Sequence, residues 1–327
     1  MNPLELILTY NILAFSTQPL FGLWVDTFRV PVQSAVLGIL LVAASTLILQ
    51  TPLLAAVISG VGNALFHVGG GAISLNLSSR KAALPGIYVA PGALGLTIGI
   101  LIGKGGYFIA WPFFLLLIGS ALLIMRIPAP EVPTPRTLPK NLRWFEPVIL
   151  LLLVSIAIRG MVGSSLVLPW KSDPALLIVL TLAVVSGKAL GGILGDRYGW
   201  TTVAVTGLVI SAPLLTLFAQ IPAVAITGIF LFNLSMPITL TALADMLPGK
   251  SGFAFGLTAL ALIIGALPTF TQLSILTSHQ MVIFAEILIS IIALYIALQL
   301  YYRHFGAQIP VQNHQTQPQV KEHRSMP

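Results

Sequence analysis

The sequence contains no cysteine. Disulfides, thiolate metal sites and a cysteine nucleophile are therefore excluded. Charged side chains are also scarce: Asp, Glu, Lys and Arg make up 8% of the 327 residues, against about 25% in an ordinary soluble domain. No Gly-rich phosphate-binding loop, cluster of metal-ligating residues or hydrolase triad can be found along the chain. No cofactor is expected, and the common enzyme chemistries have no obvious residues here.

Apolar side chains are what the chain has in abundance. They make up 57% of the residues, and the mean hydropathy is +0.98. A soluble protein of this composition could not cover its surface with polar groups, whereas in lipid the outer surface should be apolar. The formal net charge of +7 comes from basic residues in short gaps between apolar runs. That is the pattern of cytoplasmic loops, so it does not indicate a nucleic-acid partner.

Eleven apolar runs are long enough for a helix across a bilayer core, which needs about 20 residues. Two longer polar stretches remain, one predicting a cytoplasmic linker over 126–145 and one predicting a disordered cytoplasmic tail over 303–327. The expected fold is all-α and polytopic, with a five-span bundle in 1–125 and a six-span bundle in 146–302. The runs cover roughly 3–24, 31–49, 53–75, 85–103, 106–125, 146–168, 174–195, 201–219, 222–243, 252–272 and 280–301.

The basic residues predict the orientation. When the gaps are assigned alternately to the two sides, twelve basic residues fall on one side and only Lys104 and Lys171 on the other. The positive-inside rule then places the N-terminus outside and the tail in the cytoplasm of a cell-membrane protein. The twelve are Arg29, Arg80, Lys81, Arg126, Arg136, Lys140, Arg143, Arg197, Lys250, Arg303, Lys321 and Arg324.

An internal repeat appears when the sequence is shifted by 170 residues. Asp26 then falls on Asp196 and Asn63 on Asn233, and both residue types are rare in this chain. Three glycine pairs coincide in the same register, 22 with 192, 86 with 256 and 95 with 265. Parallel repeats of this kind build transporters around a site near the membrane midplane.

The same shift exposes an unmatched helix. The run 146–168 precedes the second copy, but subtracting 170 puts its mate before residue 1. We therefore expect a first half of five spans beside a second half of six. A late start codon, a shortened family member and a decayed gene each fit this pattern.

Two matched segments resemble the signature loop of the major facilitator superfamily. Residues 192–199 read GILGDRYG, and residues 22–29 read GLWVDTFR, a degraded copy in which Thr27 replaces a basic residue and Arg29 occupies the glycine position. The segment 62–67, GNALFH, is also similar to the fourth helix of efflux members of the fosmidomycin-resistance type. The resemblance covers about 1–302.

This resemblance implies a rocker-switch carrier with a central cavity between two helical bundles. It also implies a latch that holds one conformation and breaks on switching, formed here by Asp26, Arg29, Gly192, Asp196 and Arg197. A carboxylate and a guanidinium at helix ends can pair in one arrangement and part in another. The alternative is a pair of solvated turns.

Arg159 is the deepest charge in the chain, near the middle of the run 146–168. Placing a guanidinium there costs from about 3 to over 10 kcal/mol, so such residues face a cavity or a partner. Arg159 is expected to anchor an anionic substrate or a coupling carboxylate. A structural ion pair, or snorkelling helped by Gly160 and Gly163, is the competing interpretation.

Further candidates for substrate binding or coupling are Lys188, which could instead snorkel, and His67 with Asn63 in one span. Histidine titrates at physiological pH and could couple to protons, although a hydrogen-bonded structural role fits as well. Asn233 is the repeat mate of Asn63 and could bridge helices. Glu286 is the only carboxylate well inside a span and is a weaker candidate proton carrier.

The leading hypothesis is a secondary carrier of a small, perhaps-charged molecule, with an anion favoured by Arg159 and with protons as the coupling ion; drug or metabolite efflux is one version. A multi-pass membrane enzyme would need paired carboxylates or histidines at an interface, and the aspartates here are isolated. A transport-inactive relative acting as a sensor or assembly factor is the third hypothesis.

Overall fold

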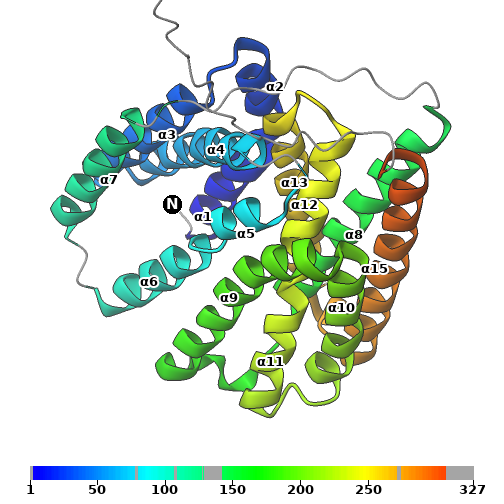
Figure 1. Cartoon of the computed structure of the whole chain (residues 1–327). Coiled ribbons are helices and arrows are strands. Elements are labelled where there is room, and N and C mark those ends of the chain that lie inside the picture. Colours follow the sequence, from blue (N-terminus) through cyan, green and yellow to red (C-terminus); the bar gives the residue numbers. More distant parts are fainter. Residues whose placement is uncertain are drawn as a thin grey trace, which may run out of the picture.

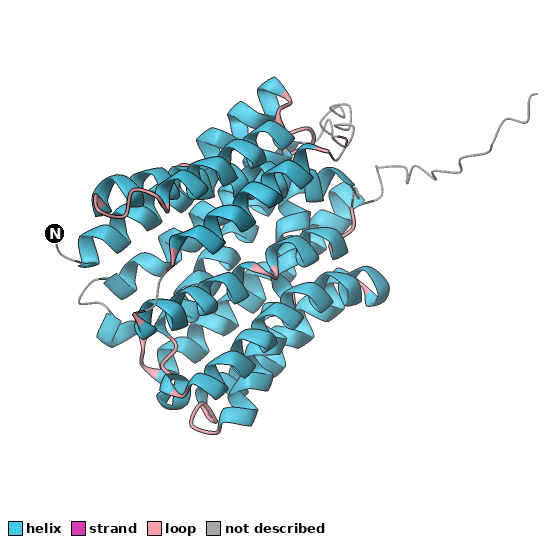
Figure 2. Cartoon of the chain, turned by 90° about the vertical axis from the view of Figure 1, so that its left-hand side faces the viewer, coloured by secondary structure: helices cyan, strands magenta, loops and turns pink. Residues whose placement is uncertain are grey.

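The computed structural model describes residues 3–77, 80–106, 109–126, 128, 142–270 and 274–306. Within these ranges the chain consists of helices and short loops, without a β-strand (Figure 2). Eight helices are long and apolar enough to cross a membrane, and three apolar helices of 15 to 17 residues accompany them. The expected eleven apolar helical segments and the all-α fold are confirmed. Most of the predicted linker and tail lies outside the described residues.

The first half of the chain starts with α1 (Pro3–Asn11), which continues through the π-helical turn η1 (Ile12–Ser16) into α2 (Gln18–Phe28). Pro19 has no N–H to give to the carbonyl four residues earlier, which accounts for the irregular turn before it. The remaining helices are α3 (Pro31–Ser45), α4 (Pro52–Leu77), α5 (Ala83–Val89), α6 (Gly92–Gly105) and α7 (Ala110–Met125).

The second half starts with the turn η2 (Leu142–Trp144) and α8 (Phe145–Ser165). A break at Leu234 divides one predicted span, because Pro237 cannot donate to the carbonyl of Asn233. The other elements are η3 (Pro169–Ser172), α9 (Pro174–Tyr198), α10 (Trp200–Thr216), α11 (Pro222–Asn233), α12 (Ser235–Met246), α13 (Ser251–Ala266), η4 (Leu267–Phe270), α14 (Ser274–Thr277), α15 (Gln280–Tyr301) and η5 (Tyr302–Gly306).

The blue-to-teal helices of the first half lie on one side of the molecule and the green-to-red helices of the second half on the other (Figure 1). Within the halves, α3 packs on α4 and α7, and α8 packs on α13 and α15. The closest contacts between the halves join α2 to α13 and α5 to α9. These two pairs correspond under the shift of 170 residues, because α2 matches the end of α9 and α5 matches the start of α13.

Two faces are named below. The aspartate face is the one at which α2 and α9 end, carrying Asp26 and Asp196. The mouth face is the opposite one, where α8 ends and α9 begins, carrying Lys171. The repeat mate of α8 would precede residue 1 of this sequence.

Candidate functional site

A cavity of about 460 Å³ lies among α8, α9, α11, α12 and α13, with side chains of α1 and η1 completing its wall. Its volume falls within the range of roughly 300–1,000 Å³ typical of small-molecule pockets. Lys171 in η3 forms part of the wall and is exposed, so the cavity reaches the mouth face. The polar and charged residues lining it are Asn11, Arg159, Lys171, Lys188, Asn233, Thr239 and Thr258.

Arg159 of α8 lies in the cavity wall with 7% of its surface exposed. Its Nε donates to the carbonyl of Ser155 at 3.2 Å, one turn earlier in the same helix. Nη1 donates to Oγ of Ser235 at 2.5 Å and Nη2 to Oγ1 of Thr239 at 2.7 Å. Among the described residues no carboxylate forms an ion pair with Arg159. Its hydrogen bonds are thus to neutral oxygens, and its charge has no counter-ion from the described chain.

The two hydroxyls lie four residues apart on α12, so they share one face of that helix. Each hydroxyl is itself bonded to the backbone: Ser235 donates to the carbonyl of Phe232 and Thr239 to that of Ser235. Both oxygens therefore keep a lone pair for the guanidinium. This arrangement fixes the position of Arg159 across the α8–α12 contact without neutralising it.

Lys188 of α9 lines the same cavity and is half-buried. It forms no hydrogen bond or ion pair within the part of the chain that the structure describes. Its backbone is closely packed, because a Cβ added to Gly86 of α5 would lie 2.7 Å from the Lys188 carbonyl oxygen. The repeat mate of Lys188 is Gln18, which is buried and donates to the carbonyl of Ala14 at 2.6 Å. The charge therefore exists on one half only.

Asn233 also lines the cavity, and its Nδ2 donates to the carbonyl of Ile229 at 2.8 Å. His67 and Asn63 lie outside the cavity wall. Nδ1 of His67 is 3.0 Å from the carbonyl oxygen of Asn63, and His67 is close enough to Lys188 for their charges to interact. The structure thus brings Arg159, Lys188 and Asn233 to one cavity, with His67 behind Lys188.

Aromatic rings fill the space around His67. Its ring centroid lies 5.5 Å from that of Phe66 and 6.4 Å from that of Phe255. Tyr88 lies 6.0 Å from Phe255, and its hydroxyl donates to the carbonyls of Phe66 and His67. Phe255 is in the second turn of α13 and Tyr88 in that of α5, so both rings lie near the aspartate face.

Asp196 holds the two halves together at the aspartate face. Its Oδ1 accepts the backbone N–H of Ala82 at 2.8 Å, and its Oδ2 accepts that of Ala83 at 2.9 Å. Nε1 of Trp200 donates to the same Oδ1 at 3.0 Å. Ala82 and Ala83 open α5, where the helix presents unpaired N–H groups and the positive end of its dipole.

Asp26 makes the corresponding contact from the first half. Its Oδ1 accepts the N–H of Gly252 at 2.9 Å and its Oδ2 that of Phe253 at 2.8 Å, in the first turn of α13. Gly252 and Phe253 are the repeat mates of Ala82 and Ala83. We call these four carboxylate–amide bonds the clasp. Since mates bond to mates on one face, the parallel internal repeat is confirmed.

The predicted latch glycine explains how the helices approach so closely. A Cβ added to Gly192 would collide with the carbonyl oxygen of Ala82, and one added to Gly22 with that of Gly252. The aspartates sit four residues later on the same helix faces, above those contacts. Small residues at the crossings therefore bring each carboxylate within reach of the opposing helix end.

The two predicted latch arginines lie differently from the aspartates. Arg29 caps α2 in the left-handed conformation (φ 57°), and its mate Gly199 also has a positive φ of 95°. This agrees with its place at the glycine position. The Cζ of Arg197 lies 5.3 Å from the centre of the Tyr198 ring. Among the described residues neither guanidinium pairs with Asp26 or Asp196, so the carboxylates bind backbone amides instead.

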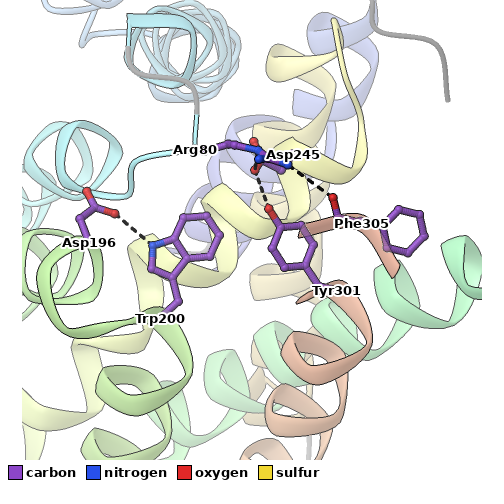
Figure 3. A network of polar contacts seen from close by, with 6 residues as sticks. All are labelled: Arg80, Asp196, Trp200, Asp245, Tyr301 and Phe305. Carbon is purple, nitrogen blue, oxygen red and sulfur yellow. Dashed lines mark hydrogen bonds and ion pairs between the residues drawn. The ribbon is translucent and has the colours of Figure 1, made fainter. Parts of the chain in front are cut away.

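A second polar connection at the aspartate face was not expected (Figure 3). Arg80, in the loop after α4, lies with its Nε 3.5 Å from Oδ2 of Asp245 in α12, and its Nη2 donates to the carbonyl of Phe305 at 3.4 Å. The hydroxyl of Tyr301 donates to the same Asp245 oxygen at 2.7 Å. In the sequence Arg80 is one of several loop cations and Asp245 an isolated carboxylate, and no spacing connects them.

Glu286 is buried in α15 and does not line the cavity. Within the described chain its Oε2 has no hydrogen-bond partner. It lies apart from Arg159, Lys188 and Asn233, so the structure brings it to none of the other candidate residues.

No protein-family model and no curated protein matches the chain. Several solved transporter structures do. The Escherichia coli fucose:proton symporter FucP is 11% identical over 90% of each chain, with a TM-score of 0.69. The human organic anion transporter TETRAN is 15% identical over 87% of this chain and 82% of its own, with a TM-score of 0.66. A bacterial homologue of ferroportin in an outward-facing state is 16% identical, covering 92% and 89%, with a TM-score of 0.58.

These likenesses establish the fold, which is that of major facilitator superfamily transporters; a second FucP structure, in the outward conformation, is described by that family name and has a TM-score of 0.68 at 12% identity, covering 91% and 90% of the two chains. The expected fold class is therefore confirmed. The similarity to fosmidomycin-resistance proteins stays a prediction.

Proposed function

We propose that this chain is a secondary transporter that moves a small molecule across the cell membrane by alternating access. The observation that carries the proposal is the combination of a cavity reaching the mouth face with a clasp at the aspartate face. The clasp joins the two halves through four hydrogen bonds to carboxylates, with no covalent link. Such a contact can form in one state and separate in another, which a bistable carrier requires.

The two halves of the clasp are matched by the repeat, which supports a rocking motion of one half against the other. Opening the aspartate face means withdrawing Asp26 and Asp196 from the first turns of α13 and α5. The freed carboxylates and amides would then be solvated, so the cost of opening is moderate. The aromatic rings of Tyr88 and Phe255 would part with those helices and uncover the cavity from that side.

The orientation that we propose follows from the basic residues. With twelve of the loop cations on one side, the aspartate face and the tail are cytoplasmic, and the cavity reaches the outside. The structure then corresponds to an outward-open state. Export of a drug or metabolite, or its uptake, both remain compatible with such a state.

Protons are the coupling ion in this proposal, and His67 is the proposed site. It is the one histidine of the described chain within the middle of a membrane-spanning helix, the others being His279 and His304 at helix ends. Histidine changes charge near physiological pH. A proton on His67 adds a positive charge near Lys188 and the cavity, so it would alter how the cavity binds a charged substrate.

The absence of native cysteine permits a direct test of alternating access. Met236 lines the cavity in α12, so Met236→Cys would place the only thiol of the chain there. The protein would be reacted with a membrane-impermeant maleimide in right-side-out and in inverted membranes. For a carrier we expect labelling from both sides, because the cavity opens to each in turn.

Thr27→Cys, exposed at the aspartate face, is the matched control and should react from one side only. A transport-inactive relative would keep one conformation. Met236→Cys labelled from a single side, in membranes where Thr27→Cys behaves as expected, would contradict the proposal.

A further inference from the structure

We propose that the cavity selects an organic anion, with Arg159 and Lys188 supplying the charge that holds its acidic group. This inference rests on the proposed function, since it names the substrate class of the proposed carrier. Arg159 comes from α8 and Lys188 from α9, and both line the same cavity. Together they make its interior cationic.

The charge of the cavity is unbalanced. Its described wall contains three cations, Arg159, Lys171 and Lys188, and no acidic side chain. The described carboxylates lie elsewhere: Asp26 and Asp196 bind amides in the clasp, and Asp245 contacts Arg80. A cationic substrate would meet uncompensated repulsion here, whereas an anion would be attracted.

Arg159 has donors to spare. A guanidinium carries five N–H groups, and three of them are used by Ser155, Ser235 and Thr239. The two that remain are one on each Nη atom, the paired geometry in which arginine binds carboxylate, sulfonate or phosphate oxygens. The neutral hydroxyls of α12 therefore orient the fork while leaving its charge available.

Removing a charge from water without a counter-ion is costly, and such groups persist where a ligand or water meets them. Lys188 presents the same situation one helix away, with no polar partner in the described chain. Its repeat mate Gln18 shows that a neutral residue fits the equivalent packing position under a glycine of the opposing helix, Gly256. The packing of α9 alone therefore does not require a cation at 188.

The rest of the wall indicates what accompanies the acidic group. Most lining residues are apolar, from Phe15 of η1 to Phe232 of α11 and Leu262 of α13. An inorganic ion would leave that surface facing water, whereas an apolar or aromatic body would cover it. Lys171 at the mouth would raise the local concentration of anions. The expected substrate is therefore amphipathic, with one acidic group.

Binding of matched probes to the purified full chain tests this inference. The probes are naphthalene-1-carboxylate, naphthalene-1-sulfonate and 1-naphthyl phosphate, with the neutral naphthalene-1-carboxamide and the cationic 1-naphthylmethylamine for comparison. Each is titrated by isothermal calorimetry against the unmodified protein and against Arg159→Gln, Arg159→Lys, Lys188→Gln and Lys104→Gln. Lys104 is exposed at the end of α6, outside the cavity, and serves as the matched control.

We expect at least one of the three anions to bind, with the amide and amine at least about tenfold weaker, as loss of one charge-assisted contact implies. Arg159→Gln and Lys188→Gln should each weaken the anion by about tenfold, Arg159→Lys by less than Arg159→Gln, and Lys104→Gln should leave it unchanged. If no anion binds, or if the amide binds equally well, the inference is wrong.

Misfolding is separated from loss of the site by size-exclusion profile and thermal unfolding of each variant, and Lys188→Gln keeps the test valid if Arg159→Gln fails to fold. Failure of this inference is distinct from failure of the carrier. Two-sided labelling of Met236→Cys without anion preference would retain the transporter and reject the substrate class. Anion binding with one-sided labelling would retain the site and reject the transport cycle.

Discussion

Asp26 and Asp196, 170 positions apart, each accept two backbone N–H bonds from residues that are themselves 170 positions apart. The relationship places the same carboxylate–amide contact twice across the boundary between the halves. It converts a weak sequence repeat into a mechanical one, because each half contributes one carboxylate and one helix end. The whole face closes only when both contacts form.

The close helix crossings under the clasp give the first prediction. Gly192→Ala forces a Cβ against the carbonyl of Ala82, and overpacking of this kind costs about 1–3 kcal/mol. We expect the thermal unfolding temperature to fall by several degrees. Gly99→Ala is the matched control, because nothing lies within 4 Å of its added Cβ and alanine favours helix. Equal or higher stability of Gly192→Ala would contradict the packing described.

The connection between Arg80 and Asp245 gives the second prediction. Tyr301→Phe removes the donor that holds Asp245 at 2.7 Å, a hydrogen bond to a charged group worth about 1.5–3 kcal/mol. We expect faster deuterium exchange of the amides in the first turn of α5, since the same face loosens. Tyr295→Phe, exposed on the same helix, should exchange like the unmodified protein. Slower or unchanged exchange in Tyr301→Phe would show that this connection does not hold the face closed.

The orientation gives the third prediction. An alkaline phosphatase reporter fused after Arg303 should be inactive, because the twelve-to-two distribution of loop cations places that end in the cytoplasm. A green fluorescent protein fused at the same residue should fluoresce and so confirms that the fusion is made. Strong phosphatase activity would reverse the assigned orientation.

The position of His67 near Lys188 gives the fourth prediction. A bound anion offsets the positive charge of Lys188, so anion binding and proton binding at His67 should favour one another. Addition of the binding naphthalene anion to the weakly buffered protein should therefore take up protons, as read by a pH dye. His67→Gln should abolish this uptake, and His279→Gln, exposed at the start of α15, should retain it. Uptake that persists in His67→Gln would assign the proton elsewhere.

The sequence predicts the fold well because hydrophobic length and loop charge are properties of single segments. The rare matched residues Asp26 and Asp196 were enough to identify the repeat. The sequence also singled out Arg159 by its depth, but its oxygen partners Ser235 and Thr239 lie on another helix and carry no spacing signal. Hydroxyl residues are common in apolar helices, so their convergence on Arg159 appears only in three dimensions.

The clasp shows the same limit more sharply. A sequence-based comparison suggests that Asp196 pairs with a nearby guanidinium, since a charge invites an opposite charge. The structure gives the carboxylate backbone amides of α5, which no residue type in the sequence can announce. The contact between Arg80 and Asp245 was likewise hidden, because 165 residues separate its two members.

The central claim is that the clasp holds one of two states, and pulsed electron–electron resonance tests it most directly. Phe28→Cys and Tyr198→Cys are repeat mates, both exposed beside the clasp aspartates, and would carry the only two spin labels. The account predicts a short distance between them with a second, longer population that becomes dominant in Asp26→Asn/Asp196→Asn. A single distance, unchanged by removing both carboxylates, would contradict the account.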